Sequence, residues 1–304
     1  MMAVLDSAPS TTTPGLAATT ASRSAKKRLS SPWASLAALV IAVLWTIPTF
    51  GLLLSSFRPE REVKTSGWWT FFADPAVTFD NYTEVLFGGS RPLSGYFLNS
   101  ILITIPSVLI PIVLATLAAY AFAWMRFPLR DTLFVAVFAL QIVPLQVALI
   151  PLLELYVGTG LNGTFWTVWI SHSIFALPLA IFLLHNSMRD IPGELVEAAR
   201  VDGAGHVRIF LTIMLPLMKP AIAAFAVFQF LWVWNDLLVA LVFAGGTPDV
   251  APLTVRVADL VGSRGSDWHL LSAGAFVSII IPLIVFLSLQ RFFVRGLLAG
   301  SVKG

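Results

Sequence analysis

Long runs of residues without a charged side chain make up most of this sequence. No Asp, Glu, Lys or Arg occurs at 29–57, 92–125, 132–153, 155–188 or 270–290, and the run 220–248 is interrupted only by Asp236. A helix that crosses a bilayer needs about 20 mainly apolar residues. The pattern therefore predicts an all-α, polytopic membrane protein with six transmembrane helices, at 34–56, 95–124, 132–154, 163–186, 220–243 and 270–291.

Composition supports the bilayer as the solvent. Hydrophobic residues make up 57% of the chain and charged residues 12%, with a mean hydropathy of +0.85, whereas soluble domains carry about 25% charged residues. The net charge of +3 is too small and too scattered for a nucleic-acid surface. The absence of cysteine excludes disulfides and thiolate metal sites. The four histidines do not have the spacing of metal ligands, so we expect no metal site; they are His172, His185, His206 and His269.

The distribution of Lys and Arg predicts the orientation. If the N-terminus lies in the cytoplasm, thirteen basic residues fall inside and six outside, so the positive-inside rule places both termini in the cytoplasm. The first 22 residues lack a basic start, and the apolar run that follows is too long for a signal peptide. We therefore expect an uncleaved first helix.

Three regions follow from this arrangement. Residues 1–32, rich in Ser, Thr, Ala and Pro, read as a disordered cytoplasmic tail. Residues 33–94 hold the first helix and a long external loop, and 95–304 a core of five helices with a cytoplasmic loop at 189–219 and a C-terminal tail. The external loop carries Trp68, Trp69, Phe71 and Phe72, which indicate either an interfacial aromatic belt or a docking surface for an external partner.

The cytoplasmic loop has helix-start and helix-stop residues. Asp190 is the expected N-cap of a short helix, Pro192 falls in its first turn, and Gly203 supplies a left-handed residue at its end. A second helix with apolar residues at helical spacing follows, and Pro216 and Pro220 are expected to end it. Because a linker does not need such caps, the loop predicts a rigid helix–turn–helix that contacts a cytoplasmic partner.

This loop resembles the EAA motif of bacterial ABC importer permeases. That motif reads Glu-Ala-Ala, three residues, Gly, nine residues, then Ile-x-Leu-Pro, and the loop matches it without departure, at Glu197, Ala198, Ala199, Gly203, Ile213, Leu215 and Pro216. The similarity runs from about Phe97 to Gly304 and is closest to MalG-like permeases of carbohydrate importers. Further matching segments are "FLNS" at 97–100, "AAYAFAWMRFP" at 118–128, "WNDLL" at 234–238 and the tail at 291–304.

The resemblance implies a set of partners and roles. The EAA loop, including Asp202, would form a coupling helix seated in a dimer of cytoplasmic ATPase subunits. The chain would pair with a second, MalF-like permease in the bacterial inner membrane, and an extracytoplasmic binding protein would deliver the sugar. The last residues would either reach the ATPase or remain a frayed tail; they are Gly300, Ser301, Val302, Lys303 and Gly304. The sequence has no phosphate loop of the form G-x-x-x-x-G-K-[ST]. We therefore expect no enzymatic activity and no bound cofactor, with ATP hydrolysed by the partner.

Several polar residues inside the predicted spans are candidates for the sugar path. Asp236 would be costly in lipid, so it should face the bundle or a wet cavity. With Trp234 and Asn235 it would either line that path or form a helix–helix hydrogen bond that holds the two permeases together, which is the commoner use of such residues. Further neutral candidates are Asn99, Gln141, Gln146 and Gln229.

Two other function classes remain open. An ion-coupled carrier or channel would place several ionisable groups within the membrane, whereas these spans hold essentially Asp236. A membrane scaffold that transports nothing would leave the caps and the EAA spacing unexplained. Within the importer class, residues 245–271 resemble permeases for alpha-glucosides and related glucosyl compounds, which include maltose-type oligosaccharides, trehalose and glucosylglycerol.

Overall fold

The computed structural model describes residues 32–244, 247–261 and 267–301, with side chains as far as Leu289. By Cα proximity the chain divides into two compact units, Met1–Leu54 and Ser55–Gly304. All regular elements in the described residues are helical, which confirms the all-α prediction. Within the described ranges, five helical segments are long and apolar enough to cross a membrane, or six if one strongly bent pair counts as a single span.

The long helices follow the predicted spans at most of their ends. The first unit contains most of α2 (Pro32–Ser56), and the second contains α5 (Leu93–Trp124), α8 (Phe165–Arg189) and α14 (Trp268–Ser301). Each is apolar over at least 18 consecutive residues. The multi-pass architecture is therefore set by continuous apolar length, as the sequence predicts.

The third predicted span, 132–154, is not one straight helix. It consists of α6 (Arg130–Ala139), the 3₁₀ turn η2 (Leu140–Ile142) and α7 (Leu145–Gly158), bent by 99°. Pro144 cannot donate a backbone hydrogen bond, and it forces Val143 into an extended conformation, with ψ of 120°. The apolar run continues through the bend, so hydropathy alone does not reveal it.

The fifth predicted span, 220–243, is wrong at both ends. A continuous apolar helical segment runs from His206 to Trp234, through α10 (His206–Ile209), the π-helical turn η3 (Phe210–Met214) and α11 (Leu215–Trp234). The prediction that Pro216 and Pro220 end the second helix of the loop is therefore wrong. Pro216 and Pro220 both lie within this segment, directly after the π-helical turn, and neither ends it. The helix ends instead at Asn235, before the short α12 (Leu238–Phe243).

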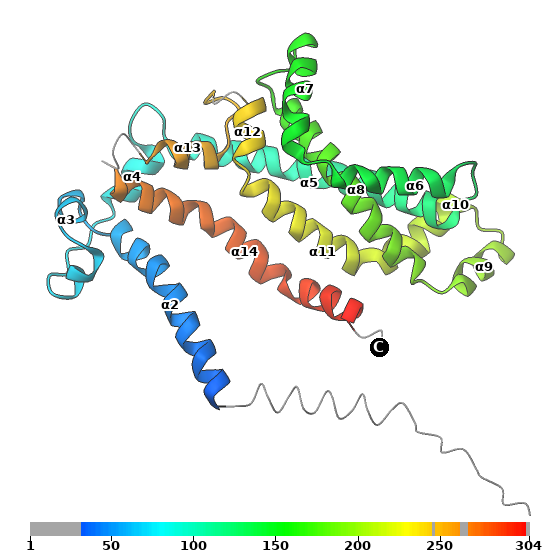
Figure 1. Ribbon diagram of the computed structural model, residues 1–304, viewed down its shortest axis with the longest axis horizontal. Helices are drawn as coiled ribbons and strands as arrows, with labels where there is room; N and C mark the ends of the chain where they lie inside the picture. Colours follow the sequence, from blue (N-terminus) through cyan, green and yellow to red (C-terminus); the bar gives the residue numbers. More distant parts are fainter. Residues whose placement is uncertain (1–31, 245–246, 262–266, 302–304) are drawn as a thin grey trace, which may run out of the picture. The chain divides into compact units, whose positions relative to one another are not determined.

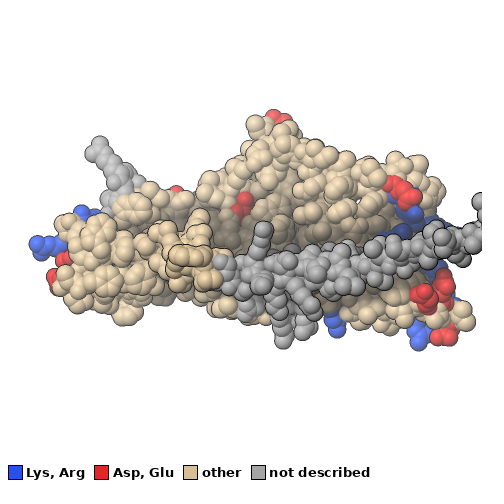
Figure 2. Space-filling view, turned by 60° about the horizontal axis from the view of Figure 1, so that its bottom comes forward, with Lys and Arg blue, Asp and Glu red and all other residues tan. Residues whose placement is uncertain are grey.

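Shorter helices lie at both ends of the second unit (Figure 1). At one end are α3 (Glu60–Thr65) and α4 (Asp80–Phe87), and at the other are α9 (Gly193–Val201) and α10. The 3₁₀ turn η1 (Trp68–Phe72) follows α3, and α13 (Leu253–Asp259) precedes α14. In the space-filling view, charged residues gather toward the two ends of the visible face, and the surface between them is almost entirely uncharged (Figure 2).

Small residues bring the central helices α5 and α8 together. Ala115, Ala119 and Ala123 recur every fourth residue on α5, and with Ala176 and Ala180 of α8 they are buried in one apolar cluster. Alanines at this spacing let two helix backbones approach closely. The same cluster includes buried residues of α9 and of the helices next to it in the chain, namely Met188, Val196, Ile209 and Met214.

Candidate functional site

The EAA segment folds into α9, a tight turn and α10. We refer to residues 193–209 as the elbow. Gly203 has a φ of +80° directly after α9, and its amide donates to the Arg200 carbonyl at 3.0 Å. The next amide, of Ala204, donates to Ala199 at 2.9 Å. These two bonds form a Schellman motif, which closes the helix and confirms the predicted stop at Gly203.

The predicted N-cap is wrong. Asp190 is the C-cap of α8, and α9 begins at Gly193 after Pro192, without a side-chain cap. Pro192 holds an extended ψ of 131° and separates the two helices. The rigidity of the elbow therefore comes from the proline before α9 and the Schellman motif after it.

One face of the elbow is anchored and the other is exposed. Val196 and Ile209 are buried in the central cluster, whereas Glu197, Ala198 and Asp202 are exposed and Ala199 is half-buried. The exposed face also carries apolar side chains: Val201 is 87% exposed and Val207 is 73% exposed. This face of the elbow therefore combines exposed apolar and acidic side chains.

The last part of the motif lies on the second arm of the elbow. Ile213 belongs to the π-helical turn, and Leu215 and Pro216 begin α11. Ile213 and Leu215 are half-buried and Pro216 is exposed. The motif thus combines exposed residues on α9 with residues that join the elbow to α11.

Hydrogen bonds and ring contacts tie the elbow to the end of α5. The Tyr120 hydroxyl lies 2.9 Å from Nδ1 of His206 and donates to the His206 carbonyl at 3.3 Å. The Tyr120 ring also meets Phe210 edge-on, with centroids 5.3 Å apart. From the other side of the turn, Arg200 donates to the Trp124 carbonyl at 3.5 Å. A displacement of the elbow must therefore move α5 as well.

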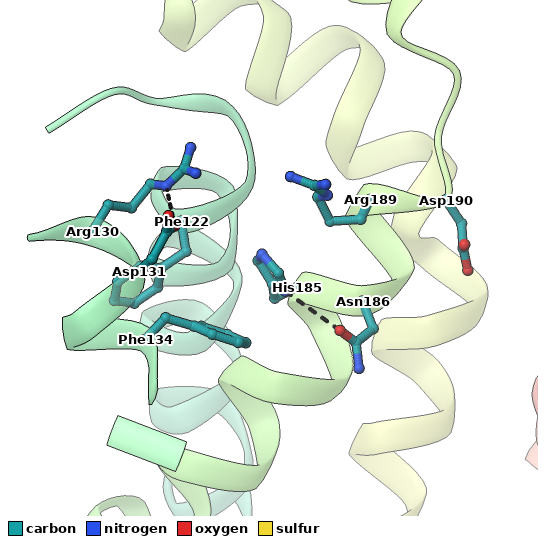
Figure 3. Close-up of a pocket in the computed structure, with 8 residues that line it drawn as sticks. All are labelled: Phe122, Arg130, Asp131, Phe134, His185, Asn186, Arg189 and Asp190. Atoms are coloured by element: carbon teal, nitrogen blue, oxygen red, sulfur yellow. Dashed lines mark hydrogen bonds and ion pairs between the residues drawn. The ribbon is translucent and has the colours of Figure 1, made fainter. Parts of the chain in front are cut away.

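A charged cavity of about 620 Å³ lies near the elbow, between α5, α6 and α8. Figure 3 shows Arg130 and Asp131 on one side of it, and His185 and Arg189 on the other. Arg130 donates to Asp131 at 2.8 Å. Because this cavity carries paired charges, it differs in chemistry from the neutral residues predicted for a sugar path.

Two of the predicted path residues lie around a different, neutral cavity. Gln141 and Gln146 flank the bend between η2 and α7 and line a space of about 450 Å³. Phe175 of α8 and Trp232 of α11 line it as well. The structure therefore brings Gln141 and Gln146 together, although their spacing of five residues gave no reason to expect it.

Two other predicted path residues form hydrogen bonds to distant segments of the same chain. Asn99 is buried and donates to the carbonyls of Pro248 and Ala251, at 2.9 and 3.1 Å. The buried Trp234 indole donates to the Ser278 carbonyl at 3.0 Å, which links α11 to α14. The Trp234 bond joins two helices of this chain, whereas the alternative that the sequence left open was a bond to the second permease.

Asn235 and Asp236 lie at the break between α11 and α12, not inside a helix. Asn235 is exposed and donates to the Leu231 carbonyl. The Asp236 carboxylate accepts from the amides of Val239 and Ala240, at 3.3 and 3.0 Å, and so caps α12. It also lies 3.7 Å from Nε2 of the buried His172. Asp236 is therefore partnered within the protein, as expected of an acid at membrane depth.

Two residues of the candidate sites were not predicted from the sequence, and part of one predicted site lies outside the described residues. Tyr120 and Trp232 were not singled out, although Tyr120 lies within the matched segment 118–128 and Trp232 lies one turn after Gln229. The predicted ATPase-contacting tail falls at the edge of the description: the backbone of Gly300 and Ser301 ends α14, and 302–304 lie outside the described residues.

Comparison with known proteins agrees with this geometry. Residues 111–299 match the family model "Binding-protein-dependent transport system inner membrane component". The chain is 56% identical to the osmoprotective compounds uptake permease protein GgtD of Synechocystis sp., over 88% of this chain and 91% of that protein. It is 40% identical to the alpha-glucoside transport system permease protein AglG of Rhizobium meliloti, over 90% of this chain and 97% of that protein.

A solved structure has a similar fold. A chain from the crystal structure of a bacterial ABC transporter that imports the acidic polysaccharide alginate superimposes with a TM-score of 0.69 at 23% identity. The match covers 86% of this chain and 98% of that one.

Proposed function

Because the chain belongs to the family of binding-protein-dependent transport system inner membrane components, we propose that it moves an alpha-glucoside-type sugar through the membrane, driven by a separate ATPase. The observation that carries the proposal is the elbow, a rigid turn with an exposed apolar and acidic face. In this account the elbow is the coupling helix. It receives the motion of a cytoplasmic ATPase dimer and passes it to the membrane helices.

The contacts of the elbow support that coupling role. Its exposed side chains are available to a partner, while Val196 and Ile209 are buried among α5, α8 and α11. Tyr120 adds a hydrogen bond from α5 to α10. A force applied at Glu197 or Val201 would therefore reach three membrane helices together, because packed interiors transmit displacement rather than absorb it.

A second membrane subunit accounts for the exposure of the broken span. At the bend, Ile142 is 80% exposed and Val143 is 52% exposed, and the backbone at Val143 is not helical. Irregular backbone at membrane depth is tolerated only where protein covers it or water lines it. A MalF-like permease packed against η2 and α7 would provide this cover.

The cargo assignment comes from relatives and from the neutral cavity. The names of the two relatives above refer to alpha-glucosides and to osmoprotective compounds. Trehalose and glucosylglycerol are alpha-glucosyl compounds that are also osmoprotective. The cavity at Gln141 and Gln146 has no charged residue in its lining. An uncharged, hydroxylated cargo fits such a lining, because amide groups both donate and accept hydrogen bonds.

The proposed orientation places the elbow and both termini on the cytoplasmic side of the bacterial inner membrane. The distribution of basic residues along the sequence favours it. The external segment 57–94 would then meet the sugar-binding protein. It exposes Trp69, Phe72 and Phe79, which would serve in docking or lie in the headgroup region.

Reconstitution tests the proposal against an ion-coupled carrier. The chain would be placed in proteoliposomes with its second permease and its ATPase, and uptake of ¹⁴C-trehalose and ¹⁴C-maltose would be measured with the binding protein outside. We expect uptake that requires ATP on the ATPase side as well as the binding protein. Uptake by this chain alone, driven by a sodium or proton gradient, would contradict the proposal and support a secondary carrier.

A further inference from the structure

Two adjoining cavities lie between the bent span, α8 and α11. The larger has a volume of about 450 Å³ and the smaller about 140 Å³. Both are lined by Gln141, Phe175 and Trp232, so they form one groove with two compartments. The larger compartment falls within the range of roughly 300–1,000 Å³ that small-molecule sites occupy.

An unpaired polar atom belongs to a side chain that lines the smaller compartment. Gln229 is fully buried on α11 and lines this space. Its Nε2 donates to the Ser107 carbonyl of α5 at 3.2 Å. Its Oε1 meets no hydrogen-bond donor among the described residues. The hydroxyl of Ser107, on the facing helix, is likewise buried without a partner. A buried amide oxygen without a donor is costly, and a small turn of the Gln229 side chain toward the adjoining compartment would let a cargo hydroxyl pair this oxygen.

Trp232 supplies an apolar surface beside this oxygen. It lies three residues after Gln229, which places both side chains on the same face of α11. The buried His172 meets the Trp232 ring edge-on, with centroids 5.6 Å apart, and so restricts its orientation. An aromatic face next to an amide suits a sugar ring, whose C–H groups and hydroxyls need both.

The opposite wall carries two more amides. Gln141 precedes the bend and Gln146 follows it, and both border the larger compartment. The bend itself removes regular helix from this depth, which membrane proteins tolerate where the chain lines a cavity. All the lining side chains are uncharged, in contrast to the charged cavity near the elbow.

We infer that this groove is a binding subsite for a neutral, polyhydroxylated cargo, in which Gln229 and Gln141 bond hydroxyl groups and Trp232 packs on a sugar ring. The inference rests on the proposed function and goes one step further. It states that this subunit itself contacts the sugar during transport, instead of leaving that contact to its partner permease.

Side-chain variants in the assembled transporter test the subsite. Gln229→Leu and Trp232→Leu should each lower the rate of ¹⁴C-trehalose uptake by about tenfold, the loss expected for one well-placed contact. Trp232→Phe keeps an aromatic face and should retain most uptake.

Ser171→Ala is the matched control. It removes a buried bond of 3.0 Å to the Tyr156 hydroxyl, between α8 and α7, and neither residue lines the groove. Uptake per assembled complex should not change. If Gln229→Leu fails to assemble, Gln141→Leu tests the same groove, since Gln141 is exposed and makes no interhelical hydrogen bond to any described residue.

A photoreactive trehalose adds a direct readout that a structural role for Gln229 would not move. Trapped during ATP hydrolysis, it should label peptides that contain residues 141–148 or 225–232. Full uptake by assembled Gln229→Leu and Gln141→Leu, or labelling confined to the partner permease, would overturn the subsite and leave the proposed function intact. Failure of the unmodified complex to take up either trehalose or maltose would instead contradict the proposed function.

Discussion

Gly203 and Tyr120 define the elbow at the scale of single residues. Gly203 has a φ of +80°, and a Cβ atom there would meet nothing within 4 Å, so only backbone conformation restricts the position. Tyr120 forms a polar link between α5 and α10. One residue sets the direction of the turn, and the other attaches it to the membrane helices.

Gly203→Pro should abolish coupling without affecting insertion. Proline requires a φ near −65° and has no amide to donate to Arg200, so the Schellman motif is lost at a cost of about 3 kcal/mol. We expect at least a tenfold fall in ATP-driven uptake with unchanged amounts of protein in the membrane fraction.

Gly205→Ala provides the control for that substitution. Gly205 has a φ of −77° and ψ of 170°, a conformation open to any residue, and a Cβ atom there would also meet nothing within 4 Å. Uptake should be unchanged. Equal uptake by both variants would remove the role assigned to the turn.

Tyr120→Phe should loosen the link between α5 and α10. The loss of one partly buried hydrogen bond costs about 1 kcal/mol, so the complex should still assemble. We expect fewer sugar molecules transported per ATP hydrolysed, measured in proteoliposomes. Tyr156→Phe loses the comparable bond to Ser171 at a site away from the elbow and should leave this ratio unchanged; an equal fall in both variants would show that the effect is not specific to the elbow.

At the scale of elements, the sequence predicts apolar length well and helix breaks poorly. The continuous runs locate α2, α5, α8 and α14, because crossing a bilayer depends on length and hydropathy. The breaks at Val143–Pro144 and at 235–237 occur inside apolar runs. They depend on local backbone chemistry, a proline in one case and the cap by Asp236 in the other, so a hydropathy window does not register them.

The candidate site likewise has a part that the sequence predicts and a part that it does not. The exposed part of the elbow could be predicted, since Glu197, Ala198 and Gly203 follow a fixed local pattern. The three glutamines of the groove were candidates from the sequence, but the groove itself could not be predicted. Gln141 and Trp232 are far apart in sequence and meet only through the packing of the bent span against α8 and α11. Trp234 looked equally suitable from sequence but packs against Phe230 and Phe97.

The helical segment at 60–72 depends on one buried cation. Arg58 is 2% exposed, and its guanidinium donates to the Gly67 carbonyl, to Ser66 Oγ and to Thr70 Oγ1 at 2.7–3.0 Å. Arg58→Ala leaves these acceptors without their donor, at a cost of about 3 kcal/mol. We expect much faster proteolysis within residues 60–72, whereas Arg61→Ala, at an exposed position, should not change the rate; equal rates for the two variants would show that Arg58 does not hold this segment.

At the scale of the whole transport unit, one continuous helical segment joins the elbow to the groove. The segment His206–Trp234 begins in the elbow, passes through the π-helical turn at 210–214 and carries Gln229 and Trp232 near its other end. A π-helical turn is a frequent feature of functional sites in long helices. Motion imposed on the elbow would therefore reach the proposed sugar contacts along a single covalent element.

The most direct test is a cross-link from the elbow to the ATPase. The chain contains no cysteine, so Ala198→Cys places a single thiol on the exposed side of α9, where a photoreactive maleimide can be attached. In the assembled complex we expect a covalent adduct with the nucleotide-hydrolysing subunit, and none from Thr83→Cys on α4. An elbow thiol that reacts with the reagent yet forms no adduct with that subunit would contradict the account.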